Sequence, residues 1–310
     1  MRRIGALLLA GCALALAFGA AANPVIDRDF PDPDLLLADG TVYAFATNVP
    51  GINVQAARSK DLKAWEALPD ALPALPAWTK PGMTWAPEVS PHPSGQGYVL
   101  YYTAAHKDSG RQCIGMATGA APAGPFVAPD DGPLICQTEE GGSIDPSLFR
   151  DEDGQHYLLW KNDGNCCGHD TWLYIQKVGP DARPTGTPTR LIRQDQDWED
   201  LLVEAPTLWR QDGRYYLFYS ANGYAGPDYA VGYAVADAPL GPYTKAEGPL
   251  LKTGREPRVL VGPGGQDVIR MPDGRLWFAY HSWNPAATHR GMHVDPLEWE
   301  AGRPKVAVGR

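Results

Sequence analysis

Three short segments decide the fold: Phe30-Pro31-Asp32-Pro33-Asp34, Ile144-Asp145-Pro146-Ser147 and Val203-Glu204-Ala205-Pro206. Each segment places an acidic residue at or just before a proline and opens an apolar run. A turn and then an aromatic strand follow each segment, and the turn is Asp39-Gly40, Asp153-Gly154 or Asp212-Gly213. Asp-Gly between apolar runs is a strong hairpin signal. The chain is therefore predicted to build the same local structure at least three times, with a carboxylate at one place in each copy.

Alignment on the proline adds two further copies of the repeat. They are Trp85-Ala86-Pro87-Glu88-Val89 and Gly262-Pro263-Gly264-Gly265-Gln266-Asp267-Val268, and each precedes a turn and an aromatic strand. The anchoring prolines then stand at 33, 87, 146, 206 and 263. A strand-rich repeat longer than 50 residues is typical of a β-propeller. We predict an all-β, five-bladed propeller as a single domain over residues 23–310; a β-sandwich or solenoid with the same strands is the alternative.

A propeller would bring the three acidic residues together. Its innermost strands surround one channel, and Asp32, Asp145 and Glu204 each stand at the start of such a strand. We therefore expect their carboxylates to converge at one mouth of the channel. Converging carboxylates in unequal environments can divide the roles of acid and base, as glycoside hydrolysis requires. The segment after Asn23 is expected to complete the last blade and close the ring.

Residues 1–22 have the pattern of a signal peptide. Arg2 and Arg3 form a basic start, an apolar run extends to Phe18, and small residues precede Asn23. The apolar run is too short for a membrane span. We predict cleavage before Asn23 and a secreted or periplasmic protein. Lipidation at Cys12 is the alternative, because Leu9-Ala10-Gly11-Cys12 resembles a lipoprotein cleavage site.

The charge of the chain limits its partners. Loss of the leader removes two arginines and leaves 25 basic against 36 acidic side chains, a net charge of −11. This charge disfavours nucleic acid, polyanions and acidic membranes as partners. It suits a neutral polysaccharide, and we expect a monomer.

Four cysteines remain in the mature chain: Cys113, Cys136, Cys166 and Cys167. In an exported protein an even number of cysteines indicates disulfides, and four allow three pairings. A Cys113–Cys136 bridge is favoured because both residues lie in apolar segments. Cys166 and Cys167 would then form a vicinal disulfide or remain thiols, in a loop at a blade edge. The cysteine and histidine spacing does not support a zinc site.

An ordered set of motifs resembles glycoside hydrolase family 43, a family of five-bladed arabinanases, arabinofuranosidases and β-xylosidases. The resemblance extends from Asn23 to Trp299, and each motif alone is weak. The set, in chain order, is Asn23-Pro24, Phe30-Pro31-Asp32-Pro33, Ser59-Lys60-Asp61-Leu62, Trp85-Ala86-Pro87-Glu88, Ile144-Asp145-Pro146-Ser147, Trp160-Lys161-Asn162-Asp163-Gly164-Asn165, Glu204-Ala205-Pro206, Tyr280-His281 and Asp295-Pro296-Leu297.

This resemblance implies an inverting mechanism with three carboxylates. Asp32 would be the general base that takes a proton from water, and Glu204 the general acid that protonates the leaving oxygen. Asp145 would orient Glu204 and keep its pKa high through a like charge nearby. The base and acid carboxyls of inverting enzymes lie about 6.5–9.5 Å apart. No metal or cofactor is required for this chemistry.

Three further residues are candidates for substrate binding. Trp85 offers an indole face on which a sugar ring packs, or it is a contact between blades. Arg290 resembles the family arginine that hydrogen-bonds the innermost sugar, with a salt bridge between blades as the alternative. His281 stands at the inner end of an aromatic strand, where it contacts a channel water or ion, or satisfies a hydrogen bond in the core.

The fifth repeat departs from the family pattern. Many relatives carry Gly-Pro-Gly-His there, whereas this chain has Gly262-Pro263-Gly264-Gly265. The missing imidazole weakens the case for a structural ion in the central channel. Asp34, close to Asp32, is a less favoured base, and Glu88 is interpreted as a structural or rim residue.

The sequence therefore predicts an exported, inverting glycoside hydrolase that acts on arabinose- or xylose-containing plant polysaccharide. An α-L-arabinofuranosidase or arabinanase is preferred, and a β-xylosidase comes next. Two alternatives are a propeller that binds sugar without cleaving it and a retaining, fructan-cleaving hydrolase. The presence of all three carboxylates argues against the first, and the anomeric configuration of the product separates the second.

Overall fold

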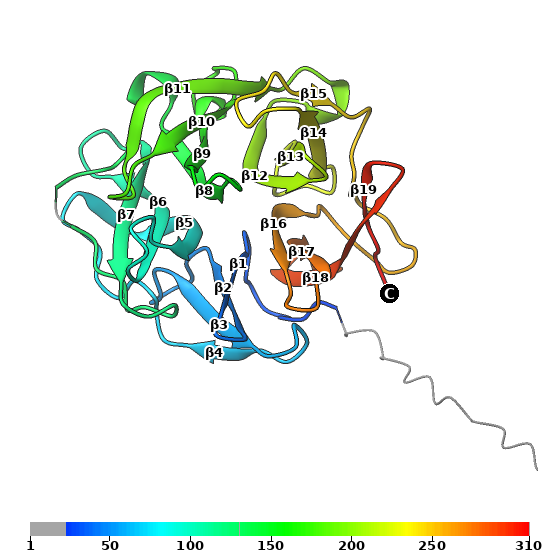
Figure 1. Ribbon diagram of the computed structural model, residues 1–310, viewed down its shortest axis with the longest axis horizontal. Helices are drawn as coiled ribbons and strands as arrows, with labels where there is room; N and C mark the ends of the chain where they lie inside the picture. Colours follow the sequence, from blue (N-terminus) through cyan, green and yellow to red (C-terminus); the bar gives the residue numbers. More distant parts are fainter. Residues whose placement is uncertain (1–22, 130, 310) are drawn as a thin grey trace, which may run out of the picture.

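Five β-sheets surround a central axis in the computed structural model, which describes residues 23–129 and 131–309 (Figure 1). No α-helix occurs in these residues; three short 3-10 helices lie in the connections, namely η1 (Thr138–Glu140), η2 (Gly164–Cys166) and η3 (Asp197–Glu199). None of the described helices is long and apolar enough to cross a membrane. The predictions of a leader and of a lipid site at Cys12 fall on residues 1–22, outside the described residues.

Each sheet is one blade, and within a blade the strands are antiparallel and follow one another outward in chain order. The strands are β1 (Asp34–Ala38), β2 (Thr41–Ala46), β3 (Gln55–Ser59) and β4 (Glu66–Leu68) in blade 1; β5 (Thr79–Pro91), β6 (Tyr98–His106) and β7 (Gln112–Gly119) in blade 2; β8 (Ser143–Arg150), β9 (His156–Asn162), β10 (Trp172–Val178) and β11 (Pro184–Arg193) in blade 3; β12 (Val203–Gln211), β13 (Arg214–Ala221), β14 (Ala230–Ala236) and β15 (Thr244–Lys245) in blade 4; and β16 (Gly264–Arg270), β17 (Leu276–Trp283), β18 (Arg290–Glu300) and β19 (Arg303–Val306) in blade 5. The predicted five-bladed propeller is confirmed.

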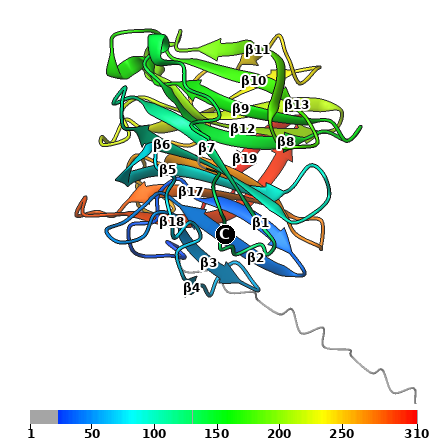
Figure 2. The same ribbon diagram turned by 90° about the vertical axis from the view of Figure 1, so that its left-hand side faces the viewer.

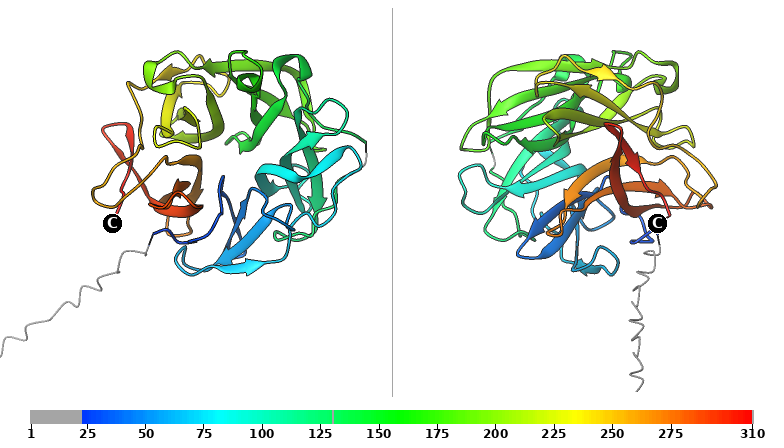
Figure 3. Two further views of the ribbon diagram at one scale, coloured as in Figure 1. Left: turned by 180° about the vertical axis from the view of Figure 1, so that it is seen from behind. Right: turned by 45° about the vertical axis from the view of Figure 1, so that its right-hand side comes forward.

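The view from behind shows the same ring (Figure 3), and the view from the side shows the blades edge-on (Figure 2). Blade 5, in orange and red, lies next to blade 1, in blue, so the last blade meets the first. The innermost strands β1, β5, β8, β12 and β16 face the axis (Figure 1). Residues at equivalent positions of these strands therefore meet around one channel.

The hydrophobic core lies in the seams between neighbouring blades. Five clusters of buried side chains occupy the five seams, one cluster to each. In the seam between blades 4 and 5, the rings of Phe218 and Phe278 meet edge to face with their centroids 5.4 Å apart. Such pairs add about 1 kcal/mol to the stability gained from buried area. The aromatic central strands thus pack blade against blade.

The N-terminal segment closes the ring against β18. Val25 N donates to Met292 O at 2.8 Å, and Met292 N donates to Ile26 O at 3.0 Å. Asn23 continues the pairing with its side chain, because its Nδ2 donates to Val294 O and its Oδ1 accepts from Val294 N, both at 3.0 Å. This confirms that the segment after Asn23 closes the ring.

One backbone feature recurs in or just before all five inner strands. Asp32, Ala86, Asp145, Ala205 and Gly265 have φ between 40° and 57°, in the left-handed region. In blades 2 to 5 the pairing register with the second strand skips at this residue, which is a β-bulge. We call these five the bulge residues. Each bulge bends the inner strand at the mouth of the channel.

The alignment of the fifth repeat on Pro263 is corrected by the bulge residues. Gln266, and not Pro263, occupies the position of the prolines in the other four blades, and Pro263 precedes β16. Alignment on proline failed here because Gln266 replaces the proline of the other repeats, and Pro263 was the nearest proline. The acids also differ in place, since Asp32 and Asp145 are bulge residues and Glu204 stands one residue before its bulge.

Asn23→Ala should weaken the closure of the ring. The substitution removes the two hydrogen bonds to Val294, each contributing about 1 kcal/mol. We expect the free energy of unfolding in urea to fall by about 1–3 kcal/mol. Lys305→Ala removes an exposed ion pair in the same blade and should change stability little. An Asn23→Ala protein as stable as the unmodified chain would contradict this account of closure.

Candidate active site

A pocket of about 500 Å³ opens where the bulge residues meet. Every blade contributes to its lining, and five of the six predicted site residues are among the contributors: Asp32, Trp85, Asp145, Glu204 and Arg290. The sequence therefore identified the three carboxylates that the fold brings together. His281, the sixth, is fully buried and does not line the pocket.

The bulge residues are tied to the preceding blade by hydrogen bonds from their main-chain N–H groups. In four seams the acceptor is a side chain at the end of the preceding blade's second strand. Ala86 N donates to Thr47 Oγ1 at 2.9 Å, and Asp145 N donates to Thr103 Oγ1 at 3.1 Å. Gly265 N donates to Ser220 Oγ at 2.9 Å, and Asp32 N donates to His281 Nδ1 at 3.1 Å. The pattern fixes the bulges with respect to one another.

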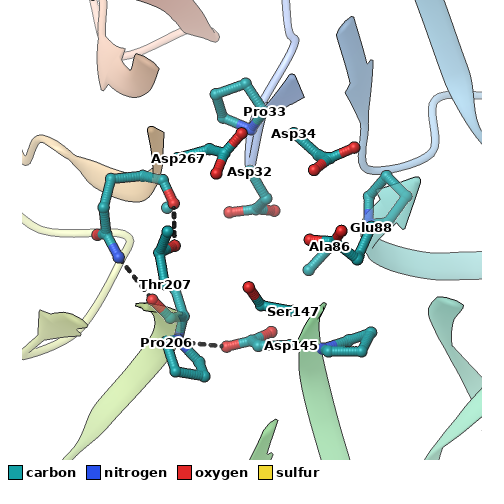
Figure 4. A pocket seen from close by; sticks show the side chains of 15 residues that line it. Asp32, Pro33, Asp34, Ala86, Glu88, Asp145, Ser147, Pro206, Thr207 and Asp267 are labelled. Atoms are coloured by element: carbon teal, nitrogen blue, oxygen red, sulfur yellow. Dashed lines mark hydrogen bonds between the residues drawn. The ribbon is translucent and has the colours of Figure 1, made fainter. Parts of the chain in front are cut away.

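Blade 3 breaks this pattern. Its second strand carries Lys161 at the equivalent position, where it pairs with Ile144, and an ammonium group has no acceptor. The N–H of Ala205 is accepted by Asp145 Oδ2 instead, at 2.9 Å (Figure 4). One oxygen of Asp145 therefore holds the main chain next to Glu204.

Asp32 lies among groups that favour its ionised form. Thr47 Oγ1 donates to its Oδ2 at 2.6 Å, and His281 Nδ1 lies 3.3 Å from its Oδ1. Burial alone raises the pKa of Asp32, but the contact with His281, the charge of Arg290 and the Thr47 hydroxyl together hold it well below its ordinary value. Asp32 is thus ionised at neutral pH, as a general base must be.

Asp145, in contrast to Asp32, favours its protonated form. Burial, and then the negative charge of Glu204, raise the pKa of Asp145 to about 8, although Lys161 opposes the shift. Glu204 accepts hydrogen bonds at both oxygens, from Tyr229 Oη at 2.8 Å and from Lys161 Nζ at 3.0 Å. The pocket therefore combines the ionised Asp32 on blade 1 with a proton-holding Asp145 on blade 3. Glu204 of blade 4 lies beside Asp145 and accepts two hydrogen bonds.

The wall of the pocket contains groups suited to a sugar ring. Trp85 is half-buried and lines the pocket. The guanidinium of Arg290 lies 5.0 Å from the ring centre of Tyr224 and 5.6 Å from that of Trp283. Its Nε is buried and lies 4.0 Å from Asp29 Oδ1, without a hydrogen bond to a described residue. An aromatic face beside a guanidinium suits a hydroxylated ring.

The sequence did not single out several residues that shape the site. Thr47, Lys161, Asn165, Tyr224 and Tyr229 all line the pocket. A signal for Lys161 was present, because the aromatic strands of the aligned repeats end in Thr47, Thr103 and Ser220, and a lysine is the exception in that series. Tyr224 and Tyr229 lie in the connection between β13 and β14, where the repeat gives no guide.

A second ring of side chains lies below the bulge residues in the channel. Its members follow the bulges by two positions and face one another, as Figure 4 shows; they are Asp34, Glu88, Ser147, Thr207 and Asp267. Asp34 Oδ2 accepts from Val89 N at 2.9 Å, and Asp267 Oδ2 accepts from Leu35 N at 2.8 Å, so these carboxyls join neighbouring blades. Glu88 is buried in this ring, and Asp34 binds main chain.

The carboxyls of this second ring hold protons. Burial, and then the charge of Asp267, raise the pKa of Glu88 to about 8, and burial raises that of Asp267 to about 7. In the described part of the chain, no three or more His, Cys, Asp or Glu side chains are grouped as metal ligands. The channel ion therefore gains no support and stays a prediction.

Both predicted cysteine pairs lie within bonding distance. Cys113 and Cys136 have Cα atoms 4.6 Å apart, and Cys166 and Cys167 are adjacent. Cys166 lines the pocket, next to Asn165. The loop that was expected at a blade edge therefore forms one wall of the site.

Comparison with known proteins now identifies the family. The model of glycosyl hydrolases family 43 matches residues 21–304. The chain belongs to this family. A solved structure titled a thermostable family-43 glycoside hydrolase is 31% identical, with a TM-score of 0.83 over 93% of this chain and 96% of that one.

Curated relatives of the family-43 chain carry several activities in their names. A β-D-galactofuranosidase of Aspergillus niger is 26% identical over 91% of this chain and 83% of its own. An extracellular exo-α-(1→5)-L-arabinofuranosidase of Cellvibrio japonicus is 27% identical over 95% and 91%. A putative β-xylosidase of Xylanibacter ruminicola is 26% identical over 89% of this chain, which spans about half of that relative's length.

The stability of this family-43 chain should fall as the pH rises from about 5 to about 9. A carboxyl with a raised pKa binds its proton more tightly in the folded state than in the unfolded state. Its favourable contribution is complete below the unfolded pKa, about 4.3 for glutamate, and is lost as the pH passes the folded pKa, which is about 8 for Glu88. Glu88→Gln removes one such group.

Urea denaturation at several pH values tests this prediction. We expect the loss of stability between pH 5 and pH 9 to be smaller in Glu88→Gln than in the unmodified protein. Glu139→Gln, at an exposed position, should leave the pH dependence unchanged. Parallel profiles for the unmodified protein and Glu88→Gln would contradict the assignment.

Proposed function

We propose that this protein is an exported, inverting glycoside hydrolase that removes or cleaves α-L-arabinofuranosyl units of plant cell-wall polysaccharide. One observation carries the proposal: the pocket joins the ionised Asp32 on blade 1 to the Asp145–Glu204 pair on blades 3 and 4. Relatives of the chain are named arabinanase, arabinofuranosidase and β-xylosidase. A β-xylosidase is the second candidate.

In the proposed reaction Asp32 accepts a proton from the attacking water. Its low pKa keeps it ionised, and the Thr47 hydroxyl fixes one oxygen, so the other is available to water. Glu204 donates a proton to the leaving oxygen as the glycosidic bond breaks. Asp145 holds Ala205, the neighbour of Glu204, through its N–H. The sugar between them inverts its anomeric configuration, because water attacks the face opposite the leaving group.

Substrate binding is assigned to Trp85 and Arg290. Trp85 packs on the apolar face of the sugar, and the Arg290 guanidinium donates to a sugar hydroxyl. His281 acts on Asp32 through its Nδ1 and does not touch the substrate. No cofactor or metal enters these steps, and we propose that the protein works as a monomer.

Export is part of the proposal. Several relatives are named extracellular, and the leader pattern and paired cysteines fit an oxidising compartment. A secreted or periplasmic enzyme would meet neutral polysaccharide directly.

Asp32→Asn and Glu204→Gln should each abolish hydrolysis while leaving the fold intact. We expect losses of at least about 100-fold in kcat/KM, since each variant removes a group that transfers a proton in the transition state. The assay measures sugar release from 4-nitrophenyl α-L-arabinofuranoside, linear arabinan and xylo-oligosaccharides. Asp39→Asn, at an exposed turn, is the matched control and should keep full activity.

The same assay distinguishes the alternatives. Release of xylose but not arabinose would favour the β-xylosidase. A protein that binds these sugars, shown by calorimetry, and hydrolyses none would be the sugar-binding propeller. Unchanged activity in both variants would refute the assignment of the site.

The cysteine pairs should be oxidised in the exported protein. Peptide mass spectrometry without reduction is expected to give one peptide pair joined by Cys113 and Cys136, and one peptide two mass units lighter that contains Cys166 and Cys167. Reduction and alkylation should then label all four cysteines. Alkylation of Cys166 and Cys167 before reduction would contradict the vicinal disulfide.

A further inference from the structure

Lys161, the last but one residue of β9, is the exception among the second-strand residues that face the bulge residues. Its side chain is fully buried, whereas lysine is almost never fully buried without partners. Blades 1 and 2 place a threonine at this position, and that threonine holds the next blade through a single hydrogen bond. The propeller architecture therefore has no need of a lysine here.

The ammonium group of Lys161 contacts three side chains, and Glu204 is one of them. Nζ donates to Glu204 Oε2 at 3.0 Å and to Asn165 Oδ1 at 2.7 Å, and lies 3.7 Å from Asp163 Oδ1. Burial lowers the pKa of Lys161, but the charges of Glu204, Asp145 and Asp163 outweigh it and leave the pKa above its ordinary value. Lys161 is thus an ammonium group held against a carboxyl.

Glu204 is held at both oxygens as a result. Lys161 fixes Oε2, and Tyr229 Oη donates to Oε1 at 2.8 Å. A proton donor in glycoside hydrolysis must be oriented toward the leaving oxygen, and it becomes a carboxylate as it gives up its proton. A cation 3.0 Å away stabilises that carboxylate and so makes the carboxyl a stronger acid.

We propose that Lys161 is a positioning residue for Glu204: it orients the carboxyl and stabilises the negative charge that appears there when the leaving oxygen is protonated. This inference rests on the proposed function. It also explains why Asp145, and not a hydroxyl of the second strand, accepts the N–H of Ala205. Lys161 occupies the position from which the other blades supply the acceptor, and its positive charge serves the reaction instead.

Other charged and titratable groups also face Glu204. On blade 3 and its loop they are Lys161, Asp145 and Asp163; the remaining ones are Asp32, Tyr229, His281 and Arg290. Lys161 is the cation in direct contact with the carboxyl. Its removal should therefore raise the pKa of Glu204, and the alkaline limb of the kcat/KM profile should move to higher pH.

Two variants and two substrates test the role of Lys161. Lys161→Thr gives blade 3 the residue that blades 1 and 2 already use, so it should fold and supply an acceptor for Ala205 N–H. Lys161→Arg keeps the positive charge. Phenyl and 2,4-dinitrophenyl α-L-arabinofuranosides differ in how strongly the leaving oxygen needs a proton. Circular dichroism and thermal unfolding check that each variant is folded.

A role in positioning the acid predicts unequal losses. Lys161→Thr should lose about 100-fold in kcat on the phenyl glycoside and less than about 5-fold on the dinitrophenyl glycoside, which departs without full protonation. Its alkaline limb should move up by at least about one pH unit. Lys161→Arg should keep the limb of the unmodified enzyme.

The contrary results are separable from failure of the proposed function. An unmodified protein that hydrolyses no glycoside would overturn the function and, with it, this role. In an active enzyme, equal losses of Lys161→Thr on both substrates together with an unmoved alkaline limb would overturn the role of Lys161 alone. If Lys161→Thr does not fold, Lys161→Arg alone decides. An alkaline limb displaced from that of the unmodified enzyme would count against the role, and an unmoved limb would support it.

Discussion

The structure depends on a hydrogen bond that recurs around the channel, from the main-chain N–H of each bulge residue to a side chain of the blade before it. The left-handed conformation of these residues leaves their N–H groups unpaired within their own sheets, and a buried N–H without an acceptor costs about 1–3 kcal/mol. Thr47, Thr103, Ser220 and His281 supply acceptors in four seams. The hydrophobic clusters give the seams their stability, whereas these bonds fix how the inner strands face one another.

The candidate site arises where this rule is broken. Lys161 cannot accept, so Asp145 takes over the N–H of Ala205, and the lysine is free to contact Glu204. The same exchange places two carboxyls and one cation side by side, opposite the ionised Asp32. The Asp145 carboxyl therefore has two functions in this account. It joins blades 3 and 4 through the N–H of Ala205, and it belongs to the proposed reaction centre.

The sequence predicted the five blades because the Asp-Gly turns and aromatic strands repeat at a spacing that only the propeller explains well. It also predicted Asp32, Asp145, Glu204 and Trp85 as neighbours, since the inner strands carry them at almost equivalent positions. Arg290, at the start of β18, was predicted from the family resemblance alone. It misplaced the fifth repeat, because proline was used as the marker and Gly265 achieves the same backbone conformation without one.

The sequence did not predict Tyr224 and Tyr229, which lie in a connection whose path is set by tertiary packing. His281 was a candidate for substrate binding, with a hydrogen bond in the core as the alternative, and the fold turns its ring against Asp32 and Tyr229.

The central claim is that water, activated by Asp32, attacks the sugar from the face opposite the proton donor. Proton NMR of the hydrolysis of an aryl α-L-arabinofuranoside tests this most directly, when spectra are recorded before the released sugar mutarotates. The account predicts that β-L-arabinose appears first and that the α anomer grows in later. Initial release of the α anomer would show retention, would require a covalent intermediate, and would contradict the assignment of Asp32 as a base.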